Sequence, residues 1–70
     1  MNEEVFNLEV RKFLKRFGVT AQREIEKAVT TALERGTLKG NEALAVNATL
    51  TISGVLPALR IEDEIHLQTP

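Results

Sequence analysis

The chain has 70 residues, of which 43% are hydrophobic and 27% are charged, and its formal net charge at pH 7 is −1. This length allows one domain, and the composition is that of a folded globular domain rather than a disordered segment. A net charge near zero provides no overall field that would favour nucleic acid or an anionic membrane. We therefore expect a single domain over residues 1–70, with any basic surface confined to one face.

Cysteine is absent, which excludes disulfides and thiolate metal sites. The chain opens on Met1, Asn2, Glu3 and Glu4, which are acidic where a secretory signal would be basic, and no apolar run approaches the roughly 18 residues of a membrane span. These features predict a cytoplasmic protein with no membrane contact. Because domains of this size are marginally stable, we also expect a well-packed core, self-association or a bound partner.

Two apolar stripes with helical spacing occupy the first half of the chain. Residues of about 3–17 and of about 21–35 each place apolar side chains on one helical face. The stripes consist of Phe6, Val10, Phe13, Leu14 and Phe17, and of Ile25, Ala28, Val29, Ala32 and Leu33. Gly18 and Gly36 follow the stripes, and glycine commonly ends a helix. The pattern predicts two amphipathic helices, joined by a link that starts at Gly18.

The period of the apolar residues then changes to two, which is typical of half-buried strands. The alternating runs cover about residues 43–53 and 58–67, and Pro57 interrupts the ladder between them. The predicted class is therefore α+β, with an antiparallel hairpin packed on the two helices. Asp63 falls on the apolar side of the second run, so we expect a bulge that turns it outward or an exposed edge.

Several segments of the sequence are distinctive: the opening Met1–Asn7, then Val10–Lys15, Gly18–Thr20 and Gln22–Glu26, and further on Lys39–Glu42 and the strand around Leu50–Ile52. In these segments the sequence resembles a family of short bacterial proteins known only as a domain of unknown function. The resemblance implies a bacterial, cytoplasmic, single-domain protein. It implies no activity, no cofactor and no functional residues.

Two charged surfaces are candidates for chemistry. A basic face on the first helix could contact phosphates; it consists of Arg11, Lys12, Lys15 and Arg16. On the second strand Glu62, Glu64 and His66 share one side and could bind a divalent cation or act as acid and base. A solvated helix face and an ordinary polar strand face explain the same residues. Nucleophile–base pairs and phosphate loops are missing from the sequence, so we do not expect an enzyme or a cofactor.

Four apolar residues fit the predicted elements badly and are candidates for a protein interface. Val5 and Leu8 lie off the stripe of the first helix, and Val55 and Leu56 lie in the hairpin turn. A hairpin of two strands also has two free edges, which pairing across a two-fold axis would cover. The leading prediction is a small non-catalytic interaction module that pairs with itself or with another protein. Nucleic-acid binding is the alternative, and a metal or acid–base site on the second strand is the third.

Overall fold

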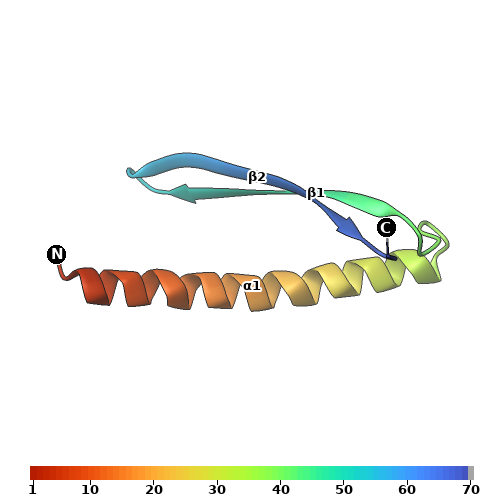
Figure 1. The fold of residues 1–70 in the computed structure, drawn as a ribbon, viewed down its shortest axis with the longest axis horizontal. Coiled ribbons are helices and arrows are strands. Elements are labelled where there is room, and N and C mark those ends of the chain that lie inside the picture. The colour runs from red at the N-terminus through yellow and green to blue at the C-terminus, as the bar shows by residue number, and fades with distance from the viewer. Residues whose placement is uncertain (70) are drawn as a thin grey trace. The chain divides into compact units, whose positions relative to one another are not determined.

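The computed structural model describes residues 1–69 and contains one helix followed by one antiparallel hairpin (Figure 1). The elements are α1 (Glu3–Glu34), β1 (Ala43–Ile52) and β2 (Leu56–His66), so the predicted α+β class is confirmed. The helix belongs to one compact unit, Met1–Thr37, and the hairpin to a second unit that starts at Leu38. The packing of the hairpin on the helix, and with it the single domain, stays a prediction.

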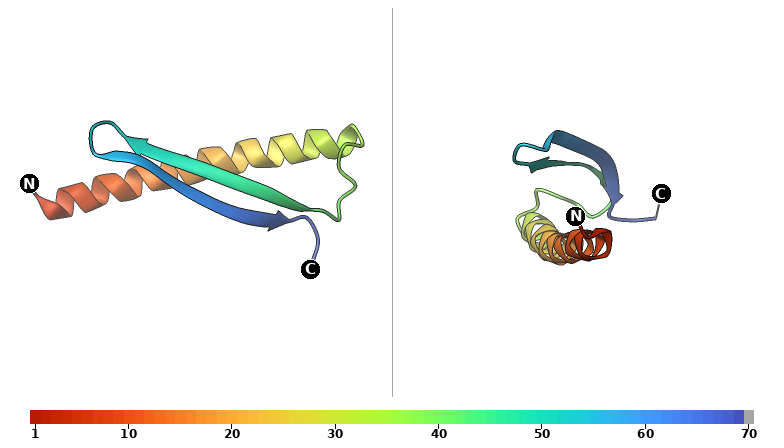
Figure 2. Two further views of the ribbon diagram at one scale, coloured as in Figure 1. Left: turned by 90° about the horizontal axis from the view of Figure 1, so that it is seen from above. Right: turned by 90° about the vertical axis from the view of Figure 1, so that its left-hand side faces the viewer.

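The prediction of two helices is wrong, because α1 continues through Gly18 without interruption (Figures 1 and 2). Positive φ angles occur within residues 1–69 at Gly36, Gly40 and Gly54, but not at Gly18. Glycine inside a helix costs about 1 kcal/mol relative to alanine. Ending the helix there would instead leave up to four C=O and four N–H groups without helical partners. The continuous hydrogen-bond ladder therefore outweighs the glycine.

The two ends of α1 agree with the prediction to within a residue, and both have identifiable caps. At the start, the Asn2 side chain accepts a hydrogen bond from the Val5 N–H at 3.1 Å. At the end, Gly36 adopts a φ of 77° and donates its N–H to the Leu33 carbonyl at 3.2 Å. Thr37 donates to the Ala32 carbonyl at 2.9 Å, which completes a Schellman motif.

Replacing Gly18, inside the helix, and Gly36, just after it, with alanine should change the free energy of unfolding in opposite directions. Gly18→Ala should raise the free energy of unfolding by about 1 kcal/mol, because a Cβ there meets nothing within 4 Å and alanine favours the helix. Gly36→Ala should lower it by about 1 kcal/mol, because an L-residue is strained at positive φ. Urea unfolding at one fixed protein concentration measures both changes. A destabilising Gly18→Ala would contradict the continuous helix.

The hairpin closes through a tight turn between Ile52 and Leu56. Gly54, with a φ of 75°, occupies the third position of the turn, and the Val55 N–H donates to the Ile52 carbonyl at 3.0 Å. A positive φ at this position is the requirement of a type II turn. At the other end of the hairpin the Leu67 N–H donates to the Glu42 carbonyl at 3.0 Å. The two strands twist along their length, as Figure 2 shows.

Pro57 lies within the second strand and not between the two strands as predicted, because β2 already begins at Leu56. The register runs without a shift from the pair Ala43–His66 to the pair Leu50–Leu59, and it shifts before Ile52–Leu56. The shift places Pro57 and Ala58 opposite Thr51. A proline is tolerated in a strand at such an irregularity, where the ladder needs no N–H donor.

Of the two alternatives predicted for Asp63, the structure excludes the bulge and agrees with the exposed position. Asp63 pairs with Val46 within the regular part of the register, on the face that carries the apolar side chains. The carboxylate avoids the cost of burial because the side chain is exposed, and it accepts a hydrogen bond from the Glu64 N–H at 2.8 Å. The apolar face of the hairpin therefore holds one negative charge near its middle.

Candidate functional site

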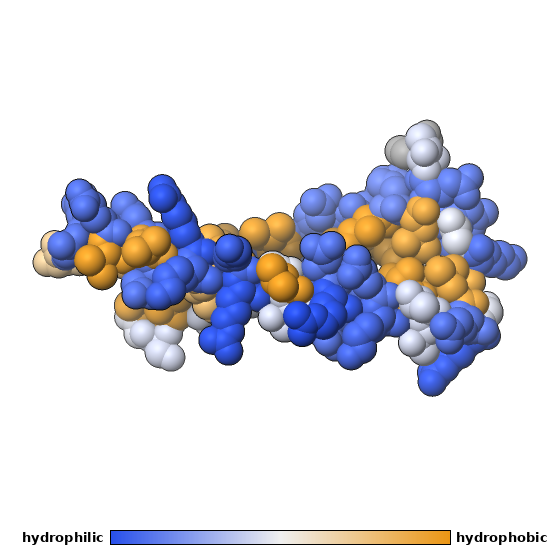
Figure 3. All heavy atoms as spheres, turned by 90° about the horizontal axis from the view of Figure 1, so that it is seen from below, coloured by the Kyte–Doolittle hydropathy of each residue, from blue (hydrophilic) through white to orange (hydrophobic). Residues whose placement is uncertain are grey.

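Apolar surface is the most prominent feature of the chain. Within residues 1–69 no side chain is buried; Val29 is half-buried, and the other large hydrophobic residues of α1 are between 38% and 56% exposed. On the face shown in Figure 3, apolar side chains (orange) reach the surface between hydrophilic ones (blue). Exposed apolar surface of this kind is a candidate interaction site. Among the same residues, no helix combines the length and the apolar content needed to cross a membrane.

The phenylalanine stripe of α1 consists of Phe6, Val10, Phe13, Leu14 and Phe17. All five side chains are exposed, and the rings of Phe13 and Phe17 stack with centroids 6.3 Å apart. The sequence interpretation placed these residues in a covered core face. Because α1 is continuous, further apolar residues follow Gly18 on the same helix, rotated around it relative to the stripe; they include Ala21, Ile25, Ala28 and Ala32. Their spacing also alternates between four and three residues, and this was the available signal that the helix continues past Gly18.

The predicted interface residues are mostly accessible. Val5 is 54% exposed, Leu8 56% and Val55 79%, whereas Leu56 is half-buried beside its partner Ile52. At about 100° per residue, Leu8 lies roughly opposite the phenylalanine stripe. Val5 and Leu8 belong to the helix unit, and Val55 and Leu56 belong to the hairpin unit. Val19, 52% exposed, lies eleven residues after Leu8 and extends its side of the helix.

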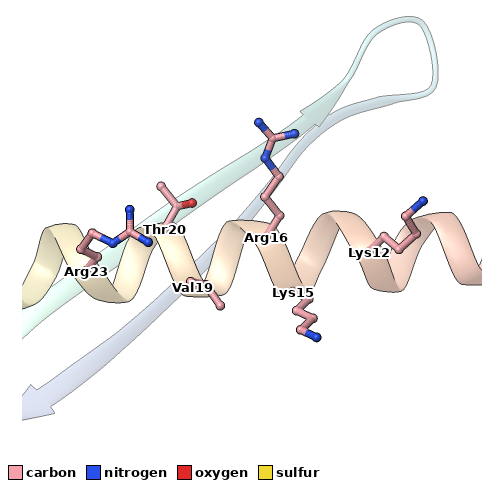
Figure 4. Close-up of a pocket in the computed structure, with 6 residues that line it drawn as sticks. All are labelled: Lys12, Lys15, Arg16, Val19, Thr20 and Arg23. Atoms are coloured by element: carbon pink, nitrogen blue, oxygen red, sulfur yellow. The ribbon is translucent and has the colours of Figure 1, made fainter.

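The predicted basic face becomes a shallow open hollow along the middle of α1. It is lined by Lys12, Lys15, Arg16, Val19, Thr20 and Arg23 (Figure 4). Arg11 is not part of it, whereas Arg23 was missed because it was assigned to a second helix. No acidic residue occurs between Glu9 and Glu24. The four cationic groups spread along the helix instead of converging on one point, as Figure 4 shows. Such a row suits an extended anion better than a small one.

The strand face with Glu62, Glu64 and His66 does not form a metal centre. The three residues share one face of β2, but Glu62 is paired with Arg60 at 2.8 Å. His66 Nε2 lies 3.7 Å from Glu64 Oε1. In the described part of the chain, residues 1–69, no three Asp, Glu or His side chains are placed to hold a metal ion. The arrangement is that of ion pairs on an exposed strand.

Glu42 has a structural role that the sequence interpretation missed. Its carboxylate accepts backbone hydrogen bonds from Lys39 at 2.9 Å, from Gly40 at 2.9 Å and from Asn41 at 3.2 Å. The Lys39 N–H is the largest influence and the Gly40 N–H the next; they hold the pKa of Glu42 below its ordinary value of 4.5. Gly40, with a φ of 107°, bends the loop around the carboxylate. Glu42 thereby fixes the loop that leads into β1.

Replacing this carboxylate should make stability depend less on pH. A lowered pKa in the folded state stabilises the fold above the ordinary carboxyl pKa, and that contribution is lost as the pH falls through the folded pKa. At pH 7, Glu42→Gln should therefore lower the urea midpoint. The difference from the unsubstituted chain should shrink as the pH falls below 4.5. Glu64→Gln, which removes a carboxylate outside this loop, serves as the control. A difference in urea midpoint that stays constant at all pH values would contradict the role of the Glu42 charge.

The fold and its surfaces define a small α+β protein with exposed amphipathic faces, and no group of side chains in residues 1–69 is placed to hold a metal ion. The chain belongs to a family of unknown function (DUF6494), whose sequence model matches residues 1–68. This membership confirms the resemblance to a domain of unknown function. No curated protein and no solved structure matches the chain.

Proposed function

We propose that this protein is a small non-catalytic interaction module that associates with a second copy of itself. The observation that carries the proposal is the absence of a buried side chain in residues 1–69, although 43% of the chain is hydrophobic. A 70-residue domain needs to remove most of its apolar surface from water to be stable. Neither the helix nor the hairpin achieves this by itself, so a further surface must cover them.

The lengths of the two elements support a partner beyond the chain's own hairpin. The 32 residues of α1 extend about 48 Å at 1.5 Å per residue. The strands, with 10 and 11 residues, extend about 35 Å at 3.3 Å per residue. A hairpin of this length is shorter than the helix by about 13 Å, so it cannot cover the helix from end to end.

The free edges of the hairpin also favour pairing with the hairpin of a second copy. Its sheet has only two strands, so each strand has one edge without hydrogen-bond partners. Two-stranded sheets are marginal by themselves, and β1 contains no proline or lysine to blunt its edge. Joining two hairpins across a two-fold axis would give a four-stranded sheet. This contact would add to any contact made by the helix.

Sedimentation equilibrium across micromolar concentrations, at low and high salt, tests the proposal. We expect a dimer that persists at high salt, because apolar contacts and strand pairing are not screened. A chain that stays monomeric up to the highest concentration would overturn it.

A second function is supported by the basic hollow, namely binding of a nucleic acid backbone. Its lining contains Lys12, Lys15, Arg16 and Arg23, and no acidic residue interrupts that stretch. Affinity for single-stranded or duplex DNA should then fall steeply with salt, and Lys15→Ala should reduce the slope by about one unit. Lys27→Ala, at a lysine paired with Glu24 at 3.5 Å, is the control. Equal slopes for the two variants would remove this function.

A further inference from the structure

We infer that two copies pair through the phenylalanine stripe, with their helices antiparallel about a two-fold axis that passes between Arg11 and Lys12. This inference rests on the proposed self-association and specifies its surface and geometry. The occupant of the stripe is a second copy of this chain. The argument uses the spacing of the stripe, the charges beside it and the point at which it ends.

The spacing of the stripe matches a short seam between two helices. Phe6, Val10, Phe13 and Phe17 follow one another at four, three and four residues, the repeat of knobs-into-holes packing. In the antiparallel arrangement Phe6 packs on the partner's Phe17, and Val10 packs on the partner's Phe13. Each of these contacts then joins one residue of the first copy to one residue of the second. Three half-exposed phenylalanines of each copy leave water in this way.

The charges beside the seam select the antiparallel direction. Glu9 and Arg16 are seven residues apart and therefore flank the same side of the stripe. In the antiparallel pair each Glu9 faces the partner's Arg16, which gives two ion pairs of opposite charge. In a parallel pair Glu9 would face the partner's Leu14, and Arg16 would face the partner's Ala21. Only the antiparallel direction is electrostatically complementary.

Neither flanking residue has a strong partner of its own. Glu9 is 3.8 Å from Lys12 within the same helix, and both side chains are well exposed, so this pair contributes little. Arg16 makes no ion pair with any residue of 1–69. Both groups are thus available for a contact between copies.

The seam ends near Gly18. Continuing the same spacing beyond Phe17 leads to Thr20, Glu24 and Lys27, which are polar or charged. The apolar residues after Gly18 are rotated around the helix axis, on average by about 80° relative to the phenylalanine stripe. A straight partner helix therefore matches Phe6–Phe17 and leaves the later apolar residues for the hairpin or another surface.

Charge reversal tests the ion pairs. Glu9→Arg and Arg16→Glu should each raise the dimer dissociation constant by about tenfold at low salt, because each replaces two attractions with two repulsions. The double variant restores opposite charges and should return to within about twofold of the unsubstituted chain. The control is Glu24→Arg, which removes a comparable pair with Lys27 at 3.5 Å but lies beyond the seam. It should leave the dissociation constant unchanged.

The direction of the helices is tested independently with a spin label. The chain has no cysteine, so Glu3→Cys provides a single attachment point in each copy. In the antiparallel dimer the labelled residue lies level with the partner's Thr20, 17 positions away, so the two labels are about 26 Å apart along the axis. In a parallel dimer they would lie side by side, about 10 Å apart between the helix axes.

The outcomes separate the two proposals. A monomeric unsubstituted chain refutes self-association itself. A dimer that is unaffected by either single reversal, or whose labels lie side by side, overturns the antiparallel seam and leaves self-association standing. Rescue in the double variant together with the long distance between labels supports the seam.

Discussion

Replacing Phe13 with glutamate should convert the proposed dimer into a monomer while α1 stays helical. Phe13 is 50% exposed in the single chain and stacks on Phe17 at the middle of the seam. Burying a carboxylate at that point without a partner costs more than the seam can offset. We expect the dimer dissociation constant to rise at least about a hundredfold, as for a central hot spot. Sedimentation equilibrium gives the mass, and circular dichroism reports the helix.

Leu8→Glu is the matched control for this change. Leu8 is 56% exposed on the same helix, but it lies on the side opposite the phenylalanine stripe. Both substitutions introduce the same charge and the same good helix former, so their effects on the free chain should be similar. Leu8→Glu should leave the dimer within about twofold of the unsubstituted chain. If Leu8→Glu instead dissociates the dimer and Phe13→Glu does not, the interface is the patch of Val5 and Leu8.

The parts of the fold that depend on local signals were predictable from the sequence. The start of α1 follows from acidic residues in the first turn, and its end follows from Gly36, whose positive φ completes the Schellman motif. The hairpin follows from alternation with a period of two on both sides of Gly54. In each case one short segment determines the conformation, so its own residue pattern is sufficient.

The errors occurred where two local signals of similar strength compete. Gly18 followed by Thr20 resembles a helix end and a new N-cap, yet it also fits a helix interior at a cost of about 1 kcal/mol. Only the hydrogen bonds of the flanking turns decide between the two. At Pro57 the outcome depends on a register shift between β1 and β2, which a single strand does not reveal.

The sequence identified the residues of the candidate surfaces, but it did not show how those residues are arranged on the folded protein. The basic residues were identified, but their extension to Arg23 depends on the helix being continuous. The Glu42 carboxylate has no sequence signature, because its three donors converge only once Gly40 has adopted its positive φ. The exposure of the phenylalanine stripe depends on what covers it, which is a property of packing between elements rather than of one element.

Ala21→Pro is the substitution that separates the continuous helix from the two-helix alternative most sharply. In the alternative, Ala21 would be the first residue of a second helix, where proline is favourable. In α1 it lies in the interior, so proline removes a hydrogen bond and its ring clashes with the carbonyl of Phe17, four residues earlier. We expect the free energy of unfolding to fall by about 3 kcal/mol or more, with a loss of helical circular dichroism.

Glu3→Pro provides the matched control, because Glu3 is the true first residue of α1 and Asn2 is its N-cap. Proline at this position loses no helical hydrogen bond, so the change should stay below about 1 kcal/mol, mainly from the lost acidic side chain. The two variants share the same new residue and differ only in their position along the helix. Equal and small effects would mean that the chain tolerates a break at Ala21. In that event the phenylalanine stripe and the apolar residues after Gly18 would belong to separate helices that can turn independently.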